Sequence, residues 1–262
     1  MTRTHKLIIL RHGESQWNHE NKFCGWIDIP LSTQGEQEAL RAGELIKAAG
    51  DLDPDIIYTS KLTRSIETGN IILHHLNKVW IDHTKTWRLN ERHYGQYQGR
   101  DKHEVFLELN QDKEKFQFIR RNYHGKPPLI PALDADPSID ERYNDILNKS
   151  ILPRGESLEM VMKRLIPYFI QEILNHQLIQ LNKTVLVVTH GSIVRSLIKF
   201  LNHVSDEDIS KINVPTGVPL VFELNDKGEL VKNYYYLDKA LAEKGMEKVR
   251  NEGLKRKNDN RL

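Results

Sequence analysis

Two His-Gly pairs, each directly after an apolar, strand-like segment, are the residues of this sequence that most suggest chemistry. His12 follows residues 7–10, and His190 follows the β-branched run at residues 184–189. In open α/β sheets, ligands bind at the edge where the parallel strands end. A single histidine at such a place would more often be an ordinary strand-end residue, but two of them favour a functional site.

The arginine next to His12 indicates what this site would hold. Neutral imidazole is a nucleophile near neutral pH, and the guanidinium of Arg11 can bind a phosphate through two directed hydrogen bonds. In phosphoryl transfer, charge spreads over the equatorial oxygens, so fixed cationic donors should surround the group. The pattern therefore predicts phosphoryl transfer with His12 as the nucleophile.

Other arginines could supply those donors. Arg64 lies after the apolar segment at residues 55–59, in the first turns of an expected helix, and is either directed to the same edge or a solvated helix residue. Arg120 and Arg121 could clamp an anion or be surface charge. Because successive helical positions point about 100° apart, the two seldom serve one salt bridge.

Glu91 is the candidate for proton transfer. It lies in the segment 87–95, where an acid stands among cations and aromatic side chains. A partly desolvated carboxyl group can exchange a proton with a substrate hydroxyl. An ion pair with Arg92 is the structural alternative.

The sequence lacks the motifs of several other enzyme classes. It has no His-Glu-x-x-His motif, and His12, His74 and His75 lack the acidic neighbours of a two-metal site, so we expect no metal. A Walker loop, a dinucleotide-binding glycine motif and a Gly-x-Ser-x-Gly elbow are also missing. Nucleotide hydrolysis, hydride transfer and serine hydrolase chemistry therefore have no support.

Composition narrows the setting of this chemistry. The 262 residues carry a formal net charge of +2 from 38 basic and 36 acidic residues, unlike a dedicated nucleic-acid binder. No apolar run approaches the ~20 residues needed to span a bilayer, and residues 1–6 lack the apolar core of a signal peptide. Cys24 is the lone cysteine, which excludes an internal disulfide and fits a reducing compartment. We expect a cytoplasmic protein that binds neither nucleic acid nor a membrane.

The elements that must position these residues alternate along the chain. Strands are expected at residues 7–10, 55–59, 79–81 and 184–189. Helices are expected at 33–49 with a capping box from Thr33, from a Ser60 cap to residue 76, at 157–181 with a kink or break at Pro167, and at 193–201. Alternating strands and helices predict an α/β fold with a mostly parallel, wound sheet.

Two segments depart from this alternation. We expect one domain over residues 1–262, with an irregular, proline-rich excursion at about 126–156. A basic, partly helical and flexible tail should start at about residue 239, with its last residues disordered. Such a tail is usually solvated, although it could bind an acidic partner.

Taken together, these motifs resemble the histidine phosphatase superfamily and, within it, the 2,3-bisphosphoglycerate-dependent phosphoglycerate mutases. The Arg11-His12-Gly13 triplet alone would support only the superfamily, whereas the segment 87–95 resembles the mutases. The likeness covers most of the chain, through residues 11–18, 23–26, 58–64, 87–95, 120–121 and 215–220.

The resemblance implies a three-layer α/β sandwich with helices on both faces of the sheet. It implies that His12 is phosphorylated, that Arg11, Arg64 and His190 hold the phosphoryl group, and that Glu91 is the general acid and base. It also implies 2,3-bisphosphoglycerate as the priming donor, no metal, and a homodimer or homotetramer. Substrate contacts carried over by the resemblance are Ser15, Asn18, Cys24, Gly25, Tyr94, Lys102, Arg120, Arg121, Gly191 and Ser192.

The function implied is the interconversion of 3-phosphoglycerate and 2-phosphoglycerate in glycolysis and gluconeogenesis. Ser192 stands where such mutases usually have Asn, Cys24 stands where Ser or Thr is common, and the tail is thought to close over the site in this family. The alternatives are a bisphosphoglycerate synthase or phosphatase, another histidine phosphatase, or a catalytically weakened binding protein.

Overall fold

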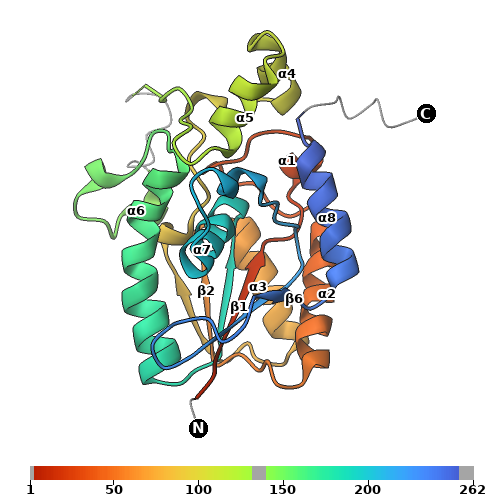
Figure 1. Cartoon of the computed structure of the whole chain (residues 1–262), viewed down its shortest axis with the longest axis vertical. Helices are drawn as coiled ribbons and strands as arrows, with labels where there is room; N and C mark the ends of the chain where they lie inside the picture. Colours follow the sequence, from red (N-terminus) through yellow and green to blue (C-terminus); the bar gives the residue numbers. More distant parts are fainter. Residues whose placement is uncertain (1–2, 132–139, 254–262) are drawn as a thin grey trace.

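A sheet of six strands forms the centre of the structure, a computed structural model that describes residues 3–131 and 140–253. Within these residues the strand order is β3-β2-β4-β1-β5-β6 (Figure 1). Strands β1, β2, β3 and β4 are mutually parallel, whereas β5 and β6 are antiparallel to their neighbours. Their bounds are β1 His5–Arg11, β2 Ile56–Thr59, β3 Asp82–Lys85, β4 Val185–Thr189, β5 Leu220–Leu224 and β6 Tyr235–Tyr236.

Helices cover both faces of this sheet, as the sequence predicted. Because neighbouring strand residues point to opposite faces, Ile9 of β1 packs into the cluster with α6 and α7, while Ile8 packs into the cluster with α2 and α3. Both residues are fully buried. Because both faces of β1 are covered, its residues 7–10 form an unbroken apolar run and do not alternate between apolar and polar residues. The main helices are α1 Gln16–His19, α2 Thr33–Ala49, α3 Thr63–His75, α4 Lys102–Glu108, α5 Lys113–Arg121, α6 Leu158–Tyr168, the π-helical segment η6 Phe169–Gln180, α7 Gly191–Asn202 and α8 Lys239–Asn251.

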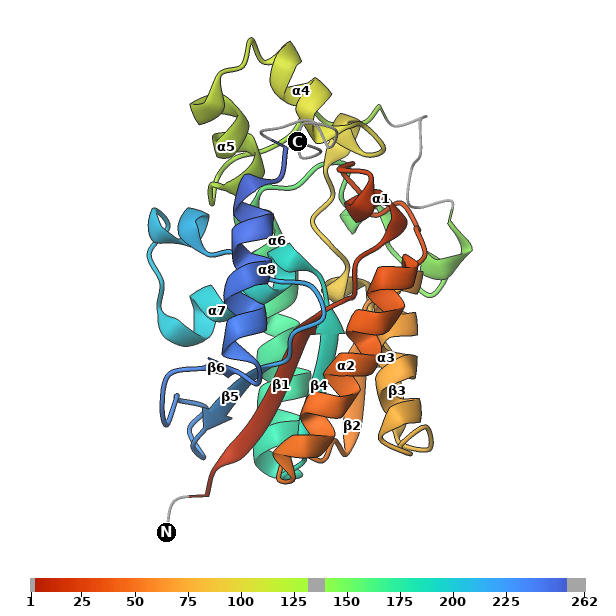
Figure 2. The same cartoon turned by 90° about the vertical axis from the view of Figure 1, so that its right-hand side faces the viewer.

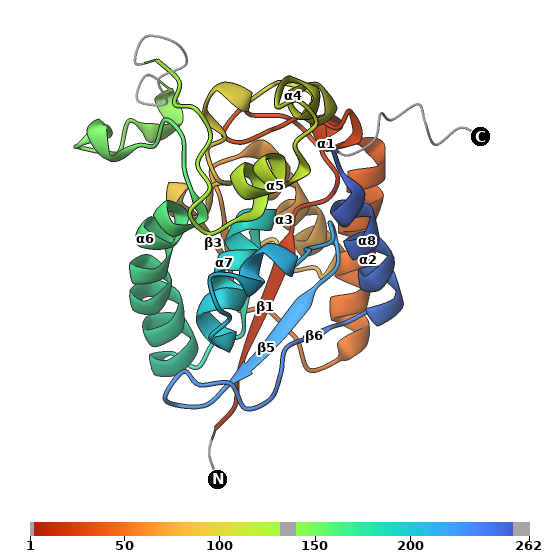
Figure 3. The ribbon, with the colours of Figure 1, turned by 45° about the horizontal axis from the view of Figure 1, so that its top comes forward.

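The strand register brings the predicted chemistry to one edge. Arg11 at the end of β1 pairs with Thr189 at the end of β4, and Thr59 at the end of β2 pairs with Val188. The residues that follow these strands therefore leave the sheet side by side. Helices α4 and α5 lie above this edge, at the top of Figure 1 and toward the viewer in Figure 3.

The position predicted for the third strand was wrong, and the two strands at the opposite end of the sheet were not predicted. The third strand is Asp82–Lys85 and not residues 79–81, where the chain turns and leaves Trp80 74% exposed. This edge strand has a single neighbour and polar, partly exposed residues, so an apolar run did not mark it. The antiparallel strands β5 and β6 were not predicted.

Two predicted helix caps shift, and the helical segment continues through Pro167 without a break. Ser32 and not Thr33 is the N-cap of α2, with its side chain accepting from the Gly35 N–H. Ser60 does not cap α3, whose N-cap is Leu62 without a side-chain bond. Pro167 lies inside α6 and cannot donate a backbone hydrogen bond, and two residues later, at Phe169, the pattern changes to the π-helical segment, which continues to Gln180.

The two irregular segments differ from one another. Short turns of 3-10 helix, η4 (Glu141–Tyr143) and η5 (Lys149–Ile151), are the helical elements of the described part of the excursion; residues 132–139 lie outside the described residues. Residues 239–251 form α8, which runs beside α2 toward the top of the molecule (Figures 1 and 2). The expected disordered end, residues 254–262, also lies outside the described residues. Over residues 3–131 and 140–253, no helix is both long and apolar enough to span a membrane.

Candidate active site

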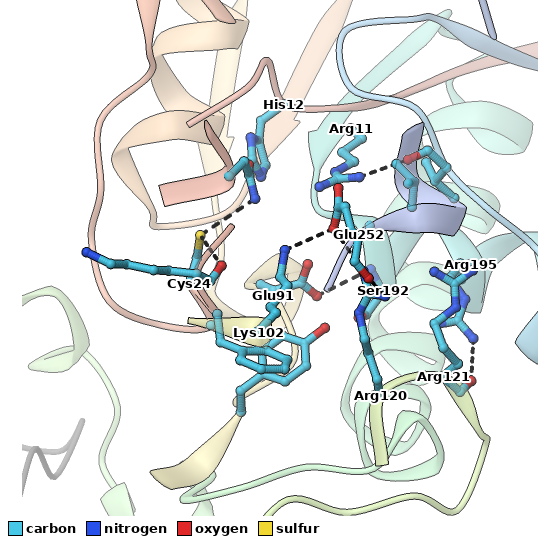
Figure 4. A pocket seen from close by; sticks show the side chains of 18 of the residues that line it. Arg11, His12, Cys24, Glu91, Lys102, Arg120, Arg121, Ser192, Arg195 and Glu252 are labelled. Atoms are coloured by element: carbon cyan, nitrogen blue, oxygen red, sulfur yellow. Dashed lines mark hydrogen bonds and ion pairs between the residues drawn. The ribbon is translucent and has the colours of Figure 1, made fainter. Parts of the chain in front are cut away.

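His12 follows the end of β1 and lies buried at the base of a pocket above the sheet edge (Figure 4). Its Nδ1 is 2.6 Å from the Gly13 carbonyl oxygen, which can only accept, so Nδ1 carries the proton and Nε2 carries the lone pair. Burial, together with Arg64 and Arg11, holds the pKa of His12 well below its usual range. The imidazole is therefore neutral near pH 7, with Nε2 as the nucleophilic atom.

Two buried arginines border that nitrogen. Arg64, at the start of α3, donates from Nε toward His12 Nε2 at 3.3 Å and fixes its other end on the carbonyl oxygens of Gly25 and Ile27. Arg11 donates to the Val214 carbonyl at 2.9 Å, while its buried Nε has no partner among the described residues. Both guanidiniums are held in place by backbone carbonyls, so they are pre-organised to receive an anion.

His190 lies beside His12, with the two ring centroids 4.9 Å apart. Its Nε2 is 2.8 Å from the Ser60 hydroxyl, which also accepts the Leu62 N–H. If Ser60 donates its proton to Nε2, Nδ1 of His190 carries the remaining proton, and this buried atom has no partner in the described part of the chain. Burial and Arg64 hold the pKa of His190 well below its usual range, so this ring is also neutral.

Glu91 lies on another wall of the pocket, in the loop after the 3-10 turn η1 (Trp87–Leu89). Its Oε1 accepts the backbone N–H groups of Arg92 at 2.7 Å and Ser192 at 3.3 Å. No hydrogen bond to Oε2 comes from the residues that the structure describes, so this oxygen is available for a proton. Arg92 instead donates its side-chain N–H groups to carbonyls of residues 119, 120 and 125, and the alternative of an ion pair with Glu91 is not found among the described residues.

The loop that carries Glu91 is held from below by a buried ion pair. Arg164 of α6 contacts Glu156 at 2.7 Å, and its other N–H groups donate to carbonyl oxygens of residues 87, 88, 90 and 91. Trp26 adds a bond from its indole N–H to the Glu91 carbonyl at 2.6 Å. These contacts fix the backbone that positions the Glu91 carboxylate.

Helices α4 and α5 supply a cationic wall opposite His12. Lys102 and Arg120 both contact the Glu252 carboxylate, at 2.9 and 2.8 Å. Arg121 points elsewhere, to the carbonyl of Ile212 and the side chain of Asn213, which agrees with the expectation that the two arginines have separate partners. Burial, together with the neighbouring Arg195 and Arg120, lowers the pKa of Arg121.

The arrangement of a neutral histidine, fixed guanidiniums and a carboxylate agrees with a comparison of the whole sequence. A sequence model of the histidine phosphatase superfamily (branch 1) matches residues 7–128 and 132–236. The chain belongs to the histidine phosphatase superfamily.

Individual relatives indicate the subfamily to which this histidine phosphatase belongs. Phosphoglycerate mutase 1 of Saccharomyces cerevisiae is 45% identical over 95% of this chain and 99% of the yeast protein. The 2,3-bisphosphoglycerate-dependent phosphoglycerate mutase of Leifsonia xyli is 44% identical over 97% of this chain and 100% of the bacterial protein. Among solved structures, Bacillus stearothermophilus YhfR has a TM-score of 0.64 at 25% identity, over 86% of this chain and 93% of that chain. The predicted family and fold class are both confirmed, and within the superfamily the chain groups with the phosphoglycerate mutases.

Most of the predicted site residues of this histidine phosphatase lie around one pocket. Ser15 and His190 are the two that do not line it. Ser15 is buried behind Cys24, where it caps α1 and bonds to Asn18. The predicted residues that line the pocket are Arg11, His12, Asn18, Cys24, Gly25, Arg64, Glu91, Tyr94, Lys102, Arg120, Arg121, Gly191 and Ser192.

The two departures from the family pattern both lie at the pocket wall. Cys24 is a free thiol whose Sγ is 3.7 Å from the Asn18 amide nitrogen and 3.6 Å from the Ser15 hydroxyl. Ser192 is the second residue of α7 and donates its backbone N–H to Glu91. Any residue other than proline would supply that backbone contact, so Ser192 preserves it without the usual amide side chain.

Several pocket residues were not found from the sequence. They come from segments far apart in the chain. Phe23 lies in the segment 23–26 of the resemblance but was not predicted as a site residue, and no sequence motif indicated the other five. The full set is Lys22, Phe23, Arg195, Val214, Val249 and Glu252. The last two belong to the C-terminal segment, for which the resemblance gave only a general expectation. Within the described residues, no cluster of His, Cys, Asp or Glu could hold a metal ion.

The buried neutral histidines predict a loss of stability in mild acid. In the unfolded chain, His12 and His190 titrate near pH ~6.5, whereas their folded pKa values lie lower. Below about pH 6.5 the unfolded state therefore binds more protons, and each such histidine lowers the free energy of unfolding by up to ~1.4 kcal/mol per pH unit. Urea unfolding between about pH 7 and 5 should show this slope. It should be shallower in His12→Asn and unchanged in a variant of the exposed His176, His176→Asn.

Proposed function

We propose that this protein interconverts 3-phosphoglycerate and 2-phosphoglycerate, with His12 as the phosphoryl carrier. The observation that carries the proposal is the Nε2 lone pair of a neutral, buried His12, bordered by Arg64 and facing a pocket that Glu91 also lines. The mutase relatives support the substrate assignment.

The pocket fits 2,3-bisphosphoglycerate as the priming donor. Two phosphates and a carboxylate need several cationic donors at separate points. Arg64 and Arg11 lie near His12, while Lys102 and Arg120 lie on another wall of the same pocket. The Nε of Arg11 is buried here and has no hydrogen-bond partner within residues 3–131 and 140–253. When bound, 2,3-bisphosphoglycerate supplies the phosphoryl group that primes His12.

The residues of the chain have separate tasks in the transfer. Nε2 of His12 forms the new bond to phosphorus as the bond from phosphorus to the ester oxygen breaks. Arg11, Arg64 and His190 hold the equatorial oxygens and offset their charge, with His190 donating from Nδ1 in the tautomer in which its Nε2 accepts from Ser60. Glu91 gives a proton to the departing oxygen, and in the reverse direction it takes the proton of the attacking hydroxyl.

The proposal is tested by a coupled enolase assay of 2-phosphoglycerate formation, run with and without added 2,3-bisphosphoglycerate. We expect stimulation by the bisphosphate and labelling of His12 by a 32P-labelled donor. Release of inorganic phosphate from 3-phosphoglycerate, measured in the same samples, should be slower than mutase turnover. Faster phosphate release would make the protein a phosphatase and would contradict the proposal.

We further propose that the enzyme acts in the cytoplasm as a homodimer or homotetramer. The free Cys24 thiol in the pocket fits a reducing compartment. Strand β3 has one neighbour in the sheet, and Val79 and Trp80 just before it are 56% and 74% exposed, so this edge can pair with a second copy. Sedimentation velocity would measure the assembly state, and Trp80→Lys should shift it toward the monomer.

A further inference from the structure

The C-terminal segment places a carboxylate inside the proposed substrate pocket. Glu252, the residue after α8, has its Oε2 2.9 Å from Lys102 Nζ and 2.8 Å from an Arg120 nitrogen (Figure 4). The other terminal nitrogen of Arg120 donates to the Glu252 backbone carbonyl at 2.7 Å. Both terminal nitrogens of Arg120 are therefore occupied by one residue of the chain itself.

Electrostatics favour this position for an anion. Among the described residues that line the pocket, seven are Lys or Arg and two, Glu91 and Glu252, are acidic. Burial by itself would raise the pKa of Glu252, but the charges of Lys102 and Arg120 outweigh it and hold the pKa well below its usual range. The carboxylate is thus charged at neutral pH, as the acid group of a phosphoglycerate would be.

The backbone around Glu252 is shaped for this contact. Lys248, one turn earlier in α8, contacts the buried Glu14 carboxylate at 2.7 Å, next to the His12 loop. After Glu252 the chain turns at Gly253 with φ of 83°, where a Cβ would come within 2.9 Å of Phe116. Glycine adopts this positive φ without strain and has no Cβ to contact Phe116. Gly253 therefore allows the chain to turn directly after Glu252.

We propose that Glu252 is an internal competitor of the substrate: its carboxylate occupies the anion position between Lys102 and Arg120, and an anionic ligand binds there only after the end of α8 has moved away. The identity of the ligand as a phosphoglycerate rests on the proposed function, whereas the competition rests on the contacts alone. Because the ligand and Glu252 need the same N–H groups, only the molecules in which Glu252 has left can bind the ligand there, and the apparent affinity is lower the smaller that fraction is. Glu252 would then set how tightly the enzyme binds anions.

The test is direct binding of 3-phosphoglycerate and of inorganic phosphate by calorimetry, without turnover. Glu252→Gln keeps the shape but removes the charge, and we expect about tenfold tighter binding, since one charge-assisted competitor is lost. Glu252→Ala should show the same direction. Glu247→Gln is the matched control, because Glu247 is an exposed residue of the same helix that does not line the pocket, and its binding should equal that of the wild type.

Unchanged or weaker binding in Glu252→Gln would overturn the proposal, because Glu252 would then be a bystander or would help to hold the ligand. Hydrogen–deuterium exchange on the wild-type protein gives a second measurement, which does not depend on how a substitution affects folding. Adding 3-phosphoglycerate should speed exchange at residues 249–253, and slower or equal exchange would contradict displacement. A protein that binds more tightly after Glu252→Gln but never labels His12 would retain this inference and lose the proposed function.

Discussion

His12→Ala should lower mutase turnover by on the order of 10⁴-fold or more and abolish the phosphorylated protein, because His12 supplies the imidazole among the described residues that line the pocket. The neighbouring His190 cannot substitute for it, since its Nε2 is bonded to the Ser60 hydroxyl. The measurements are the coupled assay and acid-labile 32P incorporation from labelled 2,3-bisphosphoglycerate.

The control for this variant is His176→Ala, which removes an exposed histidine in the π-helical segment. It should retain wild-type turnover and labelling. Circular dichroism and thermal unfolding should show that both variants are folded. If His12→Ala still incorporated phosphate, the carrier would be another residue and the proposed mechanism would be wrong.

The position of His12 could be predicted because it depends on short-range sequence signals. An unbroken apolar run marks a strand that is buried on both faces, and a polar residue at its end marks the edge of the sheet. The same reasoning placed His190, and parallel pairing of β1 with β4 then brings the two rings together. The position of each histidine at a strand end depends only on neighbouring residues, whereas the approach of the two rings depends on pairing between strands far apart in the chain.

Strand β3 and Glu252 show why other parts could not be predicted. Strand β3 is an edge strand with polar residues, so its position depends on pairing with β2 and not on an apolar pattern. Glu252 reaches Lys102 across 150 residues of sequence, and Arg164 supports the Glu91 loop across about 73. Such contacts exist only once the tertiary structure has formed, and no local motif indicates them.

Glu91→Gln should lower kcat for 3-phosphoglycerate by roughly 10²- to 10⁴-fold, the usual contribution of general acid–base catalysis. The glutamine oxygen can still accept the N–H groups of Arg92 and Ser192, so the loop and the pocket should keep their geometry. What the variant loses is the proton that the departing hydroxyl oxygen requires. Binding of 3-phosphoglycerate should therefore change much less than kcat.

The leaving group separates proton transfer from positioning. The phenolate released from 4-nitrophenyl phosphate is stable without a proton, whereas the alkoxide released from a phosphoglycerate is not. If Glu91 is the proton donor, phosphorylation of His12 by 4-nitrophenyl phosphate should be slowed less than about tenfold in Glu91→Gln, far less than the reaction with 2,3-bisphosphoglycerate. Equal losses with both donors would mean that Glu91 orients the phosphoryl group, because an orienting residue acts on the phosphoryl group whatever oxygen it leaves.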